Sequence, residues 1–210
     1  MLYPIFLDLT GRNVLVVGAG AVAARKVSGL LRAGARVSVV APEVCEALEE
    51  KEREGAVRIL RRPYRASDLE GCWLVVAATD EPELNGAVSE DAAGARLFCN
   101  VVDQPALCSF QVPAVVRRGL LQIAVSTGGA SPALARRIRL ALEEVYGPAY
   151  GEFLDALLDL REHFQRKYPQ DQQQRRRLLE SFIDSSAPDL LLRDGDTHAF
   201  LVRLERWQSR

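Results

Sequence analysis

The chain has 210 residues, 48% of them hydrophobic, and a formal net charge of -1, so it can bury a globular core and has no overall basic field for nucleic acid. The sequence has no run of roughly 20 apolar residues, the length that spans a bilayer, and no pattern typical of an N-terminal signal peptide. Its four cysteines form no CxxC pair. We therefore expect a cytoplasmic protein that binds no nucleic acid, no membrane and no resident metal ion.

The first 112 residues alternate between strand and helix patterns. Short β-branched apolar runs predict buried parallel strands, and the amphipathic runs between them predict helices. The expected strands are Asn13–Val17, Arg36–Val40, Val57–Leu60, Trp73–Ala77 and Leu97–Cys99. The expected helices are Ala21–Arg32, Glu43–Glu54 and Glu83–Ala93. Such alternation forms right-handed βαβ units, so we predict an α/β, Rossmann-like parallel sheet over residues 1–112.

The pattern changes after residue 112. Runs at Ala114–Arg117 and Leu120–Ser126 predict a β-hairpin joined by Arg118-Gly119. A helix is expected next, from Pro132 up to the Gly147-Pro148 stop, because Ser131 is a good N-cap. Its apolar residues recur at helical spacing, at Leu134, Ile138, Leu142 and Val145. From there the chain is helical and polar. We predict a hairpin-plus-helix region over 113–147 and an all-helical domain over 148–210.

A glycine-rich loop joins the first strand to the first helix. Gly18, Ala19, Gly20, Ala21 and Val22 fit the GxGxxG/A pattern, with Ala23 in the last position. The first glycine permits a tight turn, the second lets the backbone approach a pyrophosphate, and the helix amides hold the phosphates. The alternative is a purely structural glycine turn. We predict that this loop binds a dinucleotide.

The segment after the second strand bears on the choice of cofactor. Ala41 and Pro42 occupy the place where an acid is usual, and Glu43 is the nearest carboxylate. It can reach the ribose hydroxyls and would repel a 2′-phosphate, which favours NAD over NADP. Alternatively, Glu43 is an ordinary acid in the first turn of a helix.

The segment after the fourth strand is expected to face the cofactor. Thr79 and Asp80 stand there, and Asp80 either orients the nicotinamide end or caps the following helix. We favour the cap. Asn85 is expected on the surface of that helix unless it turns inward.

Asp103 follows the fifth strand at the edge of the sheet where ligands of open α/β sheets bind. A lone carboxylate in a partly desolvated cleft beside a dinucleotide can act as a base in a redox step. We predict that Asp103 is catalytic.

A second glycine-rich turn opens onto the helix that begins at Pro132. Its hydroxyls and amides suit an anion such as a substrate carboxylate, and the predicted contacts are Ser126, Thr127, Gly128, Gly129 and Ser131. Alternatively, the turn is a hairpin exit followed by an N-cap.

Several of these motifs together resemble one family, the precorrin-2 dehydrogenase and sirohydrochlorin ferrochelatase family, which forms the N-terminal module of siroheme synthase. The matching stretches are GAGAVAARK (18–26), VVAPE (39–43), ATDEPELN (78–85), NVVDQPALCSF (100–110) and PAVVRRGLLQIAVSTGGASPALARRIR (113–139). Thr127 stands where some members have a serine, so regulation specific to that serine is not expected to carry over. The chain ends at Arg210, so the methyltransferase domain of some relatives is not expected.

The resemblance implies oxidation of precorrin-2, which carries eight carboxylates, to sirohydrochlorin with NAD as hydride acceptor. It also implies a homodimer formed through residues 113–147, a catalytic role for Asp103 and a substrate contact at Asn100 of the same NVVD motif. Insertion of Fe²⁺ as a second substrate stays open. Two alternatives remain: a dehydrogenase without chelatase activity, and an NAD-responsive binding module without chemistry.

Overall fold

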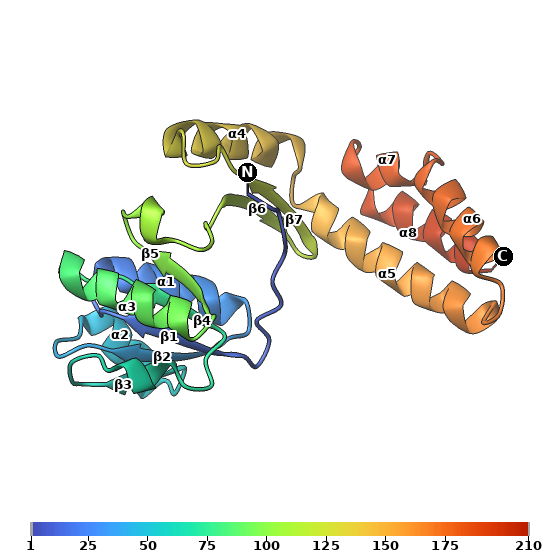
Figure 1. The fold of residues 1–210 in the computed structure, drawn as a ribbon. Helices are drawn as coiled ribbons and strands as arrows, with labels where there is room; N and C mark the ends of the chain where they lie inside the picture. The colour runs from blue at the N-terminus through green and yellow to red at the C-terminus, as the bar shows by residue number, and fades with distance from the viewer. Residues whose placement is uncertain (1, 210) are drawn as a thin grey trace. The chain divides into compact units, whose positions relative to one another are not determined.

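The computed structural model describes residues 2–209 and divides into two compact units, Met1–Val112 and Pro113–Arg210 (Figure 1). We describe each unit by itself.

The first unit is a parallel five-stranded sheet with the strand order β3-β2-β1-β4-β5. Its strands are β1 (Asn13–Val17), β2 (Arg36–Val40), β3 (Val57–Leu60), β4 (Leu74–Ala77) and β5 (Phe98–Val101). Its α-helices are α1 (Ala21–Arg32), α2 (Glu46–Arg53) and α3 (Pro82–Gly94), and its 3-10 helices are η1 (Ala66–Leu69) and η2 (Pro105–Leu107). The Rossmann-like sheet that the sequence predicts is confirmed.

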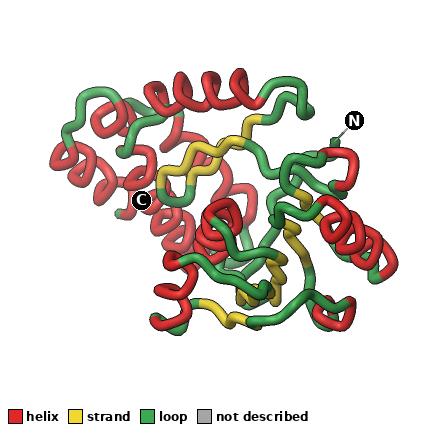
Figure 2. The backbone as a smooth tube through the Cα atoms, turned by 90° about the vertical axis from the view of Figure 1, so that its left-hand side faces the viewer, coloured by secondary structure: helices red, strands yellow, loops and turns green. Residues whose placement is uncertain are grey.

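Helices cover both faces of this sheet, which explains why its strands are largely apolar (Figure 2). Val14 and Val16 of β1 share one core cluster with Ala23 and Val27 of α1 and with Leu48 of α2. The alternate β1 residues, Leu15 and Val17, share the opposite cluster with Val88 and Ala92 of α3. Successive strand side chains point to opposite faces, so each strand contributes to both layers.

Several element boundaries differ from the predicted ones, many of them by one residue. The second helix begins at Glu46, not at Glu43, because the segment before it binds the glycine loop: the Cys45 amide donates to the Ala19 carbonyl at 3.0 Å. The last strand extends to Val101, two residues further than predicted. The hairpin turn is Gly119-Leu120 rather than Arg118-Gly119, since Arg118 pairs with Leu121.

The second unit begins with the antiparallel hairpin of β6 (Ala114–Arg118) and β7 (Leu121–Val125). Gly119 in its turn has a φ of 55°, and a Cβ there would lie 3.2 Å from Gly151 Cα. Glycine at both positions therefore lets the turn pack against the start of α5. Arg118, next to this turn, also holds the end of α4, since its Nε donates to the Tyr146 carbonyl at 2.9 Å.

Helices form the rest of the second unit: α4 (Pro132–Val145), α5 (Ala149–Lys167), α6 (Gln172–Ile183), α7 (Ala187–Leu192) and α8 (Thr197–Gln208). Aromatic side chains dominate their core, with Phe164, Phe182 and Phe200 at most 2% exposed. The all-helical C-terminal part is therefore confirmed. Among residues 2–209, no helix is both long and apolar enough to cross a membrane.

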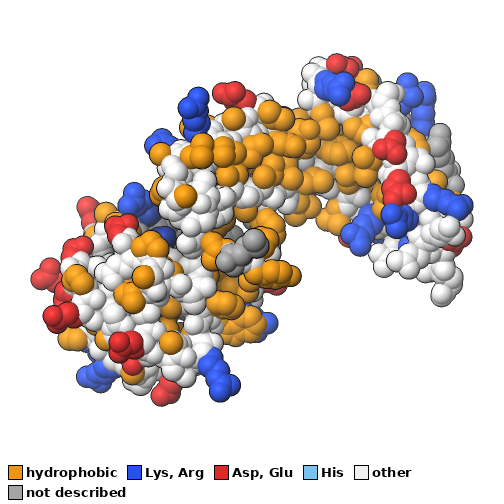
Figure 3. All heavy atoms as spheres, turned by 45° about the horizontal axis from the view of Figure 1, so that its top comes forward, with side chains coloured by type: hydrophobic (Ala, Val, Ile, Leu, Met, Phe, Trp, Pro, Cys, Tyr) orange, Lys and Arg blue, Asp and Glu red, His pale blue; other side chains and the backbone are white. Residues whose placement is uncertain are grey.

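The apolar stripe of α4 is largely exposed. Leu134, Ile138 and Val145 are 48%, 39% and 66% exposed, and Ala135 is the buried residue of this helix. A band of hydrophobic side chains is visible across the second unit in Figure 3. Within the described chain, the face that the periodicity marks as a core face has no partner.

Candidate functional site

The strand order reverses between β1 and β4, because the chain builds β2 and β3 on one side of β1 and then crosses to the other. Ligands of open α/β sheets bind at the carboxyl ends of strands at such a switch point. The segments that follow β1, β4 and β5 all lie at this edge, since the strands are parallel. They carry the predicted glycine loop, Thr79, Asp80 and Asp103.

Gly18 is required where the first two of these segments meet. Its φ is 99°, and a Cβ there would lie 2.4 Å from the Ala78 carbonyl oxygen and 3.0 Å from Thr79 Cγ2. The Gly18 amide donates to the Val40 carbonyl at 2.9 Å. The loop after β1 therefore touches the segment after β4 so closely that no side chain fits between them.

Gly20, unlike Gly18, has open space where a side chain would stand. It is the N-cap residue of α1, no side chain caps that helix, and a Cβ there would meet nothing within 4 Å. The first-turn amides of Ala21 and Val22 have no partner in a regular helix, and the first turn holds no acidic side chain. This arrangement fits an anionic pyrophosphate, because the free amides and the helix dipole both favour it. Ala19, between the two glycines of this loop, is buried.

Glu43, the acid in the segment after β2, lies outside any helix. Ala41 is buried, and its amide donates to the Leu60 carbonyl at 3.2 Å, whereas Pro42 and Glu43 are exposed. The first-turn acids of α2 are Glu46 and Glu49. The alternative interpretation of Glu43 as a first-turn helix acid is therefore wrong, because the helix begins three residues later. Its predicted contact with the ribose stays a prediction.

The segment after β4 is held by Asn85 and not by Asp80. Glu81 is the N-cap residue of α3, and no side chain caps that helix, so the predicted cap at Asp80 is wrong. Asp80 is exposed. Asn85 was expected on the surface but is 2% exposed, and its amide group bonds to Thr79. Asn85 could have been found from its spacing, because it lies three and seven residues before the buried Val88 and Ala92 on one helix face.

Asp103 occupies a strained turn directly beyond β5. The Val102 amide extends the sheet by donating to the Ala77 carbonyl at 2.9 Å, and the Gln104 amide closes the turn on the Val101 carbonyl at 3.5 Å. Asp103 has a φ of 59°, a left-handed conformation that few residues other than glycine adopt. Its side chain is exposed, so this unit alone does not supply the expected desolvation.

The free edge of β5 is covered by the returning segment 108–110. Ser109 Oγ accepts from the Cys99 amide at 2.7 Å, and Cys108 Sγ accepts from the Val101 amide at 3.2 Å. Asn100, which is 7% exposed, donates to the Phe110 carbonyl at 3.1 Å. The buried amide of Asn100 thus holds this return in place, and its predicted contact with a substrate stays a prediction.

One of the thiols at this edge is unreactive at neutral pH. Burial raises the pKa of the Cys99 thiol to about 11. Cys99 therefore remains protonated and serves as a core residue.

The turn before α4 belongs to the second unit and is largely bonded internally. Thr127 Oγ1 accepts from the Ser131 amide and donates to the Ser131 carbonyl, both at 3.1 Å. Ser131 Oγ caps α4 by accepting from the Leu134 amide at 3.2 Å, as predicted for an N-cap. The Gly128 amide donates to Ser126 Oγ at 3.1 Å. Donors of this turn that have no partner among residues 2–209 include the Ser126 hydroxyl and the Gly129 amide, and these can bind a ligand.

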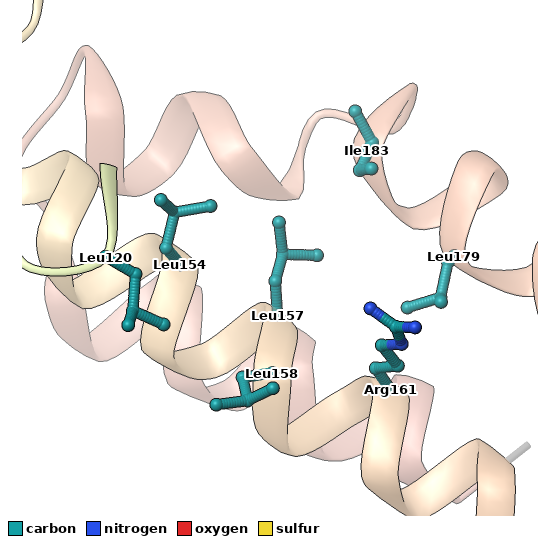
Figure 4. Close-up of a pocket in the computed structure, with 7 residues that line it drawn as sticks. All are labelled: Leu120, Leu154, Leu157, Leu158, Arg161, Leu179 and Ile183. Carbon is teal, nitrogen blue, oxygen red and sulfur yellow. The ribbon is translucent and has the colours of Figure 1, made fainter. Parts of the chain in front are cut away.

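A shallow apolar hollow of about 280 Å³ lies elsewhere in the second unit (Figure 4). Leucines of α5 and the α6 side chains Leu179 and Ile183 lie on opposite sides of it, with Arg161 at the rim. It holds no carboxylate, thiol or imidazole and so offers no acid–base chemistry. Among residues 2–209, no group of three or more His, Cys, Asp or Glu side chains is placed to hold a metal ion.

The chain matches two family models. One, described as "Putative NAD(P)-binding", matches residues 5–114, and the other, described as "Sirohaem biosynthesis protein central", matches residues 118–144. The first match covers the sheet with its glycine loop, and the second covers most of the hairpin and α4. The first unit is therefore NAD(P)-binding.

Curated relatives and a solved structure agree with these matches. A siroheme synthase of Pseudomonas entomophila is 48% identical over 172 residues, which is 82% of this chain and 37% of the relative. A siroheme synthase of Pseudomonas fluorescens is 42% identical over 203 residues, which is 97% of this chain and 44% of the relative. The chain thus spans less than half the length of these relatives. The structure of the precorrin-2 dehydrogenase SirC matches with a TM-score of 0.79 and 32% identity, over 98% of this chain and 100% of that one.

Proposed function

The chain belongs to the precorrin-2 dehydrogenase family, the N-terminal module of siroheme synthases, and we propose that it oxidises precorrin-2 to sirohydrochlorin. The observation that carries this proposal is the position of Asp103. This carboxylate sits in a left-handed turn two residues past β5, at the same edge of the sheet as the glycine loop. Strained backbone at a ligand-binding edge is a common mark of a functional residue.

The reaction removes one hydride and one proton from the macrocycle. When bound, a nicotinamide dinucleotide would supply the acceptor for the hydride, which is one proton with two electrons, from a reduced ring carbon. Asp103 accepts the proton that the macrocycle loses in the same oxidation. Since its side chain is exposed in the first unit, the bulky substrate itself would exclude water from the carboxylate.

Three segments of the first unit would hold the dinucleotide. Residues 18–22 would bind the pyrophosphate through the free amides of α1, and residues 41–43 would contact the adenosine ribose. Thr79 and Asp80 would face the nicotinamide end. Glu43 supports NAD over NADP, because an exposed carboxylate beside the ribose would bond its hydroxyls and repel a 2′-phosphate.

We propose contacts for the substrate's carboxylates in each unit separately. Asn100 and the turn from Ser126 to Ser131 are the proposed contacts. Within that turn, the Ser126 hydroxyl and the Gly129 amide are among the groups left to donate, while hydrogen bonds of Thr127, Gly128 and Ser131 shape the turn.

We also propose that the chain is a homodimer, with residues 113–147 as the dimerisation region between the domains 1–112 and 148–210. The exposed stripe of Leu134, Ile138 and Val145 supports this, because soluble proteins rarely leave such a face to water. Ile138→Glu should then convert a dimer into a monomer in sedimentation equilibrium. Leu201→Glu, at an equally exposed leucine of α8, is the matched control and should remain dimeric. A monomeric wild-type protein would refute the dimer.

The experiment that tests the proposed activity is direct. The purified protein with precorrin-2 and NAD should form NADH and sirohydrochlorin in equal amounts. No NADH would leave only the non-catalytic binding module. Fe²⁺ insertion is tested in a second arm, by adding Fe²⁺ and sirohydrochlorin. Insertion no faster than without protein would make this chain a dehydrogenase alone.

A further inference from the structure

Among residues 2–209, the side chain of Asn85 forms hydrogen bonds to a single residue, which lies in the segment after β4. Its Nδ2 donates to the Thr79 carbonyl at 3.0 Å. Its Oδ1 accepts from Thr79 Oγ1 at 2.8 Å and from the Thr79 amide at 3.4 Å. The buried amide thus engages both backbone groups and the hydroxyl of Thr79.

The bonded Thr79 in turn shapes the rest of the segment. Its Oγ1 accepts from the Glu81 amide at 3.2 Å, which bends the chain into α3. Its hydroxyl is then fully used within the protein, and Cγ2 is directed at the glycine loop, 3.0 Å from where a Gly18 Cβ would stand. A shift of Thr79 would therefore move the surface against which Gly18 packs.

This contact lies at the switch point between β1 and β4, where the dinucleotide would bind. Packing of α3 onto the sheet depends on other residues, because Val88 and Ala92 form the buried apolar face of that helix. Losing the Asn85 amide should then disturb the segment at the cofactor end more than it disturbs the core.

We propose that Asn85 is a positioning residue that binds Thr79 and so holds the segment 78–81 against the glycine loop in the conformation that receives the dinucleotide. The proposal rests on the proposed function of the first unit. A buried polar side chain without such a role would cost stability when removed, and would affect all ligands alike.

The test is direct binding of NAD by calorimetry, followed by steady-state kinetics. Asn85→Ala should raise the Kd and the KM for NAD about tenfold, which corresponds to about 1.4 kcal/mol. The KM for precorrin-2 and the kcat at saturating NAD should stay within about twofold of the wild-type values. The reason is that losing the preorganisation of the NAD site weakens the binding of NAD alone. Tyr64→Phe is the matched control. It removes another side-chain hydrogen bond to α3, from Tyr64 to Asp91 at 3.0 Å, and should leave NAD binding unchanged.

A second variant keeps the test informative if Asn85→Ala does not fold. Thr79→Val removes the hydroxyl partner but keeps the methyl group, so it should weaken NAD binding to a similar extent. In the double variant the combined loss should be smaller than the sum of the two, because both single variants remove the hydrogen bond from Thr79 Oγ1 to Asn85 Oδ1. Thr79→Ser should bind closer to wild type.

The outcomes separate this inference from the proposed function. A wild-type protein that binds no NAD overturns both. Wild-type binding with unchanged affinity in both Asn85→Ala and Thr79→Val overturns the positioning role alone. Equal losses for NAD and precorrin-2 also overturn it, since they indicate a general structural role.

Discussion

The sulfur of Cys108 lies 3.2 Å from both the backbone nitrogen and the carbonyl oxygen of Val101. Val101 is the first residue of the turn that holds Asp103, and the turn's own hydrogen bond is long, at 3.5 Å. The thiol also contacts the carbonyl of Gln104, at the far side of the turn, at 3.4 Å. A cysteine side chain therefore links the two ends of the segment on which the proposed catalytic carboxylate stands.

We predict that Cys108→Ala loosens this turn. The Val101 amide loses its acceptor, so the free energy of unfolding should fall by about 1 kcal/mol, and amide exchange at residues 101–104 should accelerate. Cys108→Ser should recover part of the protection, because a hydroxyl can donate and accept. Cys72→Ala serves as the control within the same unit, since its thiol contacts the Asp68 carbonyl instead. Unchanged exchange at residues 101–104 in Cys108→Ala would contradict the prediction.

The two loop glycines should respond differently to the same substitution. Gly18→Ala places a Cβ 2.4 Å from the Ala78 carbonyl oxygen at a φ of 99°, so we expect a loss of about 2 kcal/mol or more in unfolding free energy. Gly20→Ala meets no protein atom within 4 Å, so the fold should hold while NAD affinity falls, on the order of tenfold or more. Chemical denaturation and calorimetry separate the two effects. Gly20→Ala with normal NAD affinity would argue against a pyrophosphate at this loop.

Glu43 should set the preference for NAD. In Glu43→Gln the carboxylate no longer repels a 2′-phosphate, so the ratio of kcat/KM for NAD to that for NADP should fall by about tenfold. Glu46→Gln, an exposed acid in the first turn of α2, is the control and should keep the wild-type ratio. The Glu43 interpretation fails if both variants keep the same ratio.

A partly buried ion pair should make the first unit sensitive to acid. Arg62 bonds Asp68 at 2.5 Å, and this guanidinium contact lowers the pKa of Asp68, whose side chain is 6% exposed. Because the folded-state pKa lies below the unfolded one, the stabilisation is full above the unfolded value and is lost as pH falls through the folded value. Asp68→Asn should therefore lower stability at neutral pH and flatten its decline below about pH 5. Denaturation curves at several pH values check this, and an unaltered acid limb would contradict it.

The sequence carried enough information for the sheet, because buried parallel strands must be apolar on both faces, as Asn13–Val17 and Arg36–Val40 largely are. Interactions between residues of different elements could not be predicted from the sequence. Glu46 begins α2 because Cys45 binds Ala19 of the glycine loop. The inward position of Asn85 was accessible from its helical spacing, but its three hydrogen bonds to Thr79 were not.

The backbone conformation of Asp103 could not be predicted from the sequence either. Nothing in the NVVD motif states that Asp103 has a positive φ, since aspartate adopts that conformation only where the surrounding turn requires it.

The most direct measurement compares NADH formation by the wild-type protein and Asp103→Asn, with precorrin-2 and NAD at saturation and NAD affinity measured on the same samples. Asparagine tolerates the left-handed turn and keeps the side-chain shape, so it removes only the base. We predict that the rate falls at least about a hundredfold, the range for a lost general base, while NAD affinity is unchanged. A variant that forms NADH at the wild-type rate would show that Asp103 does not take the proton.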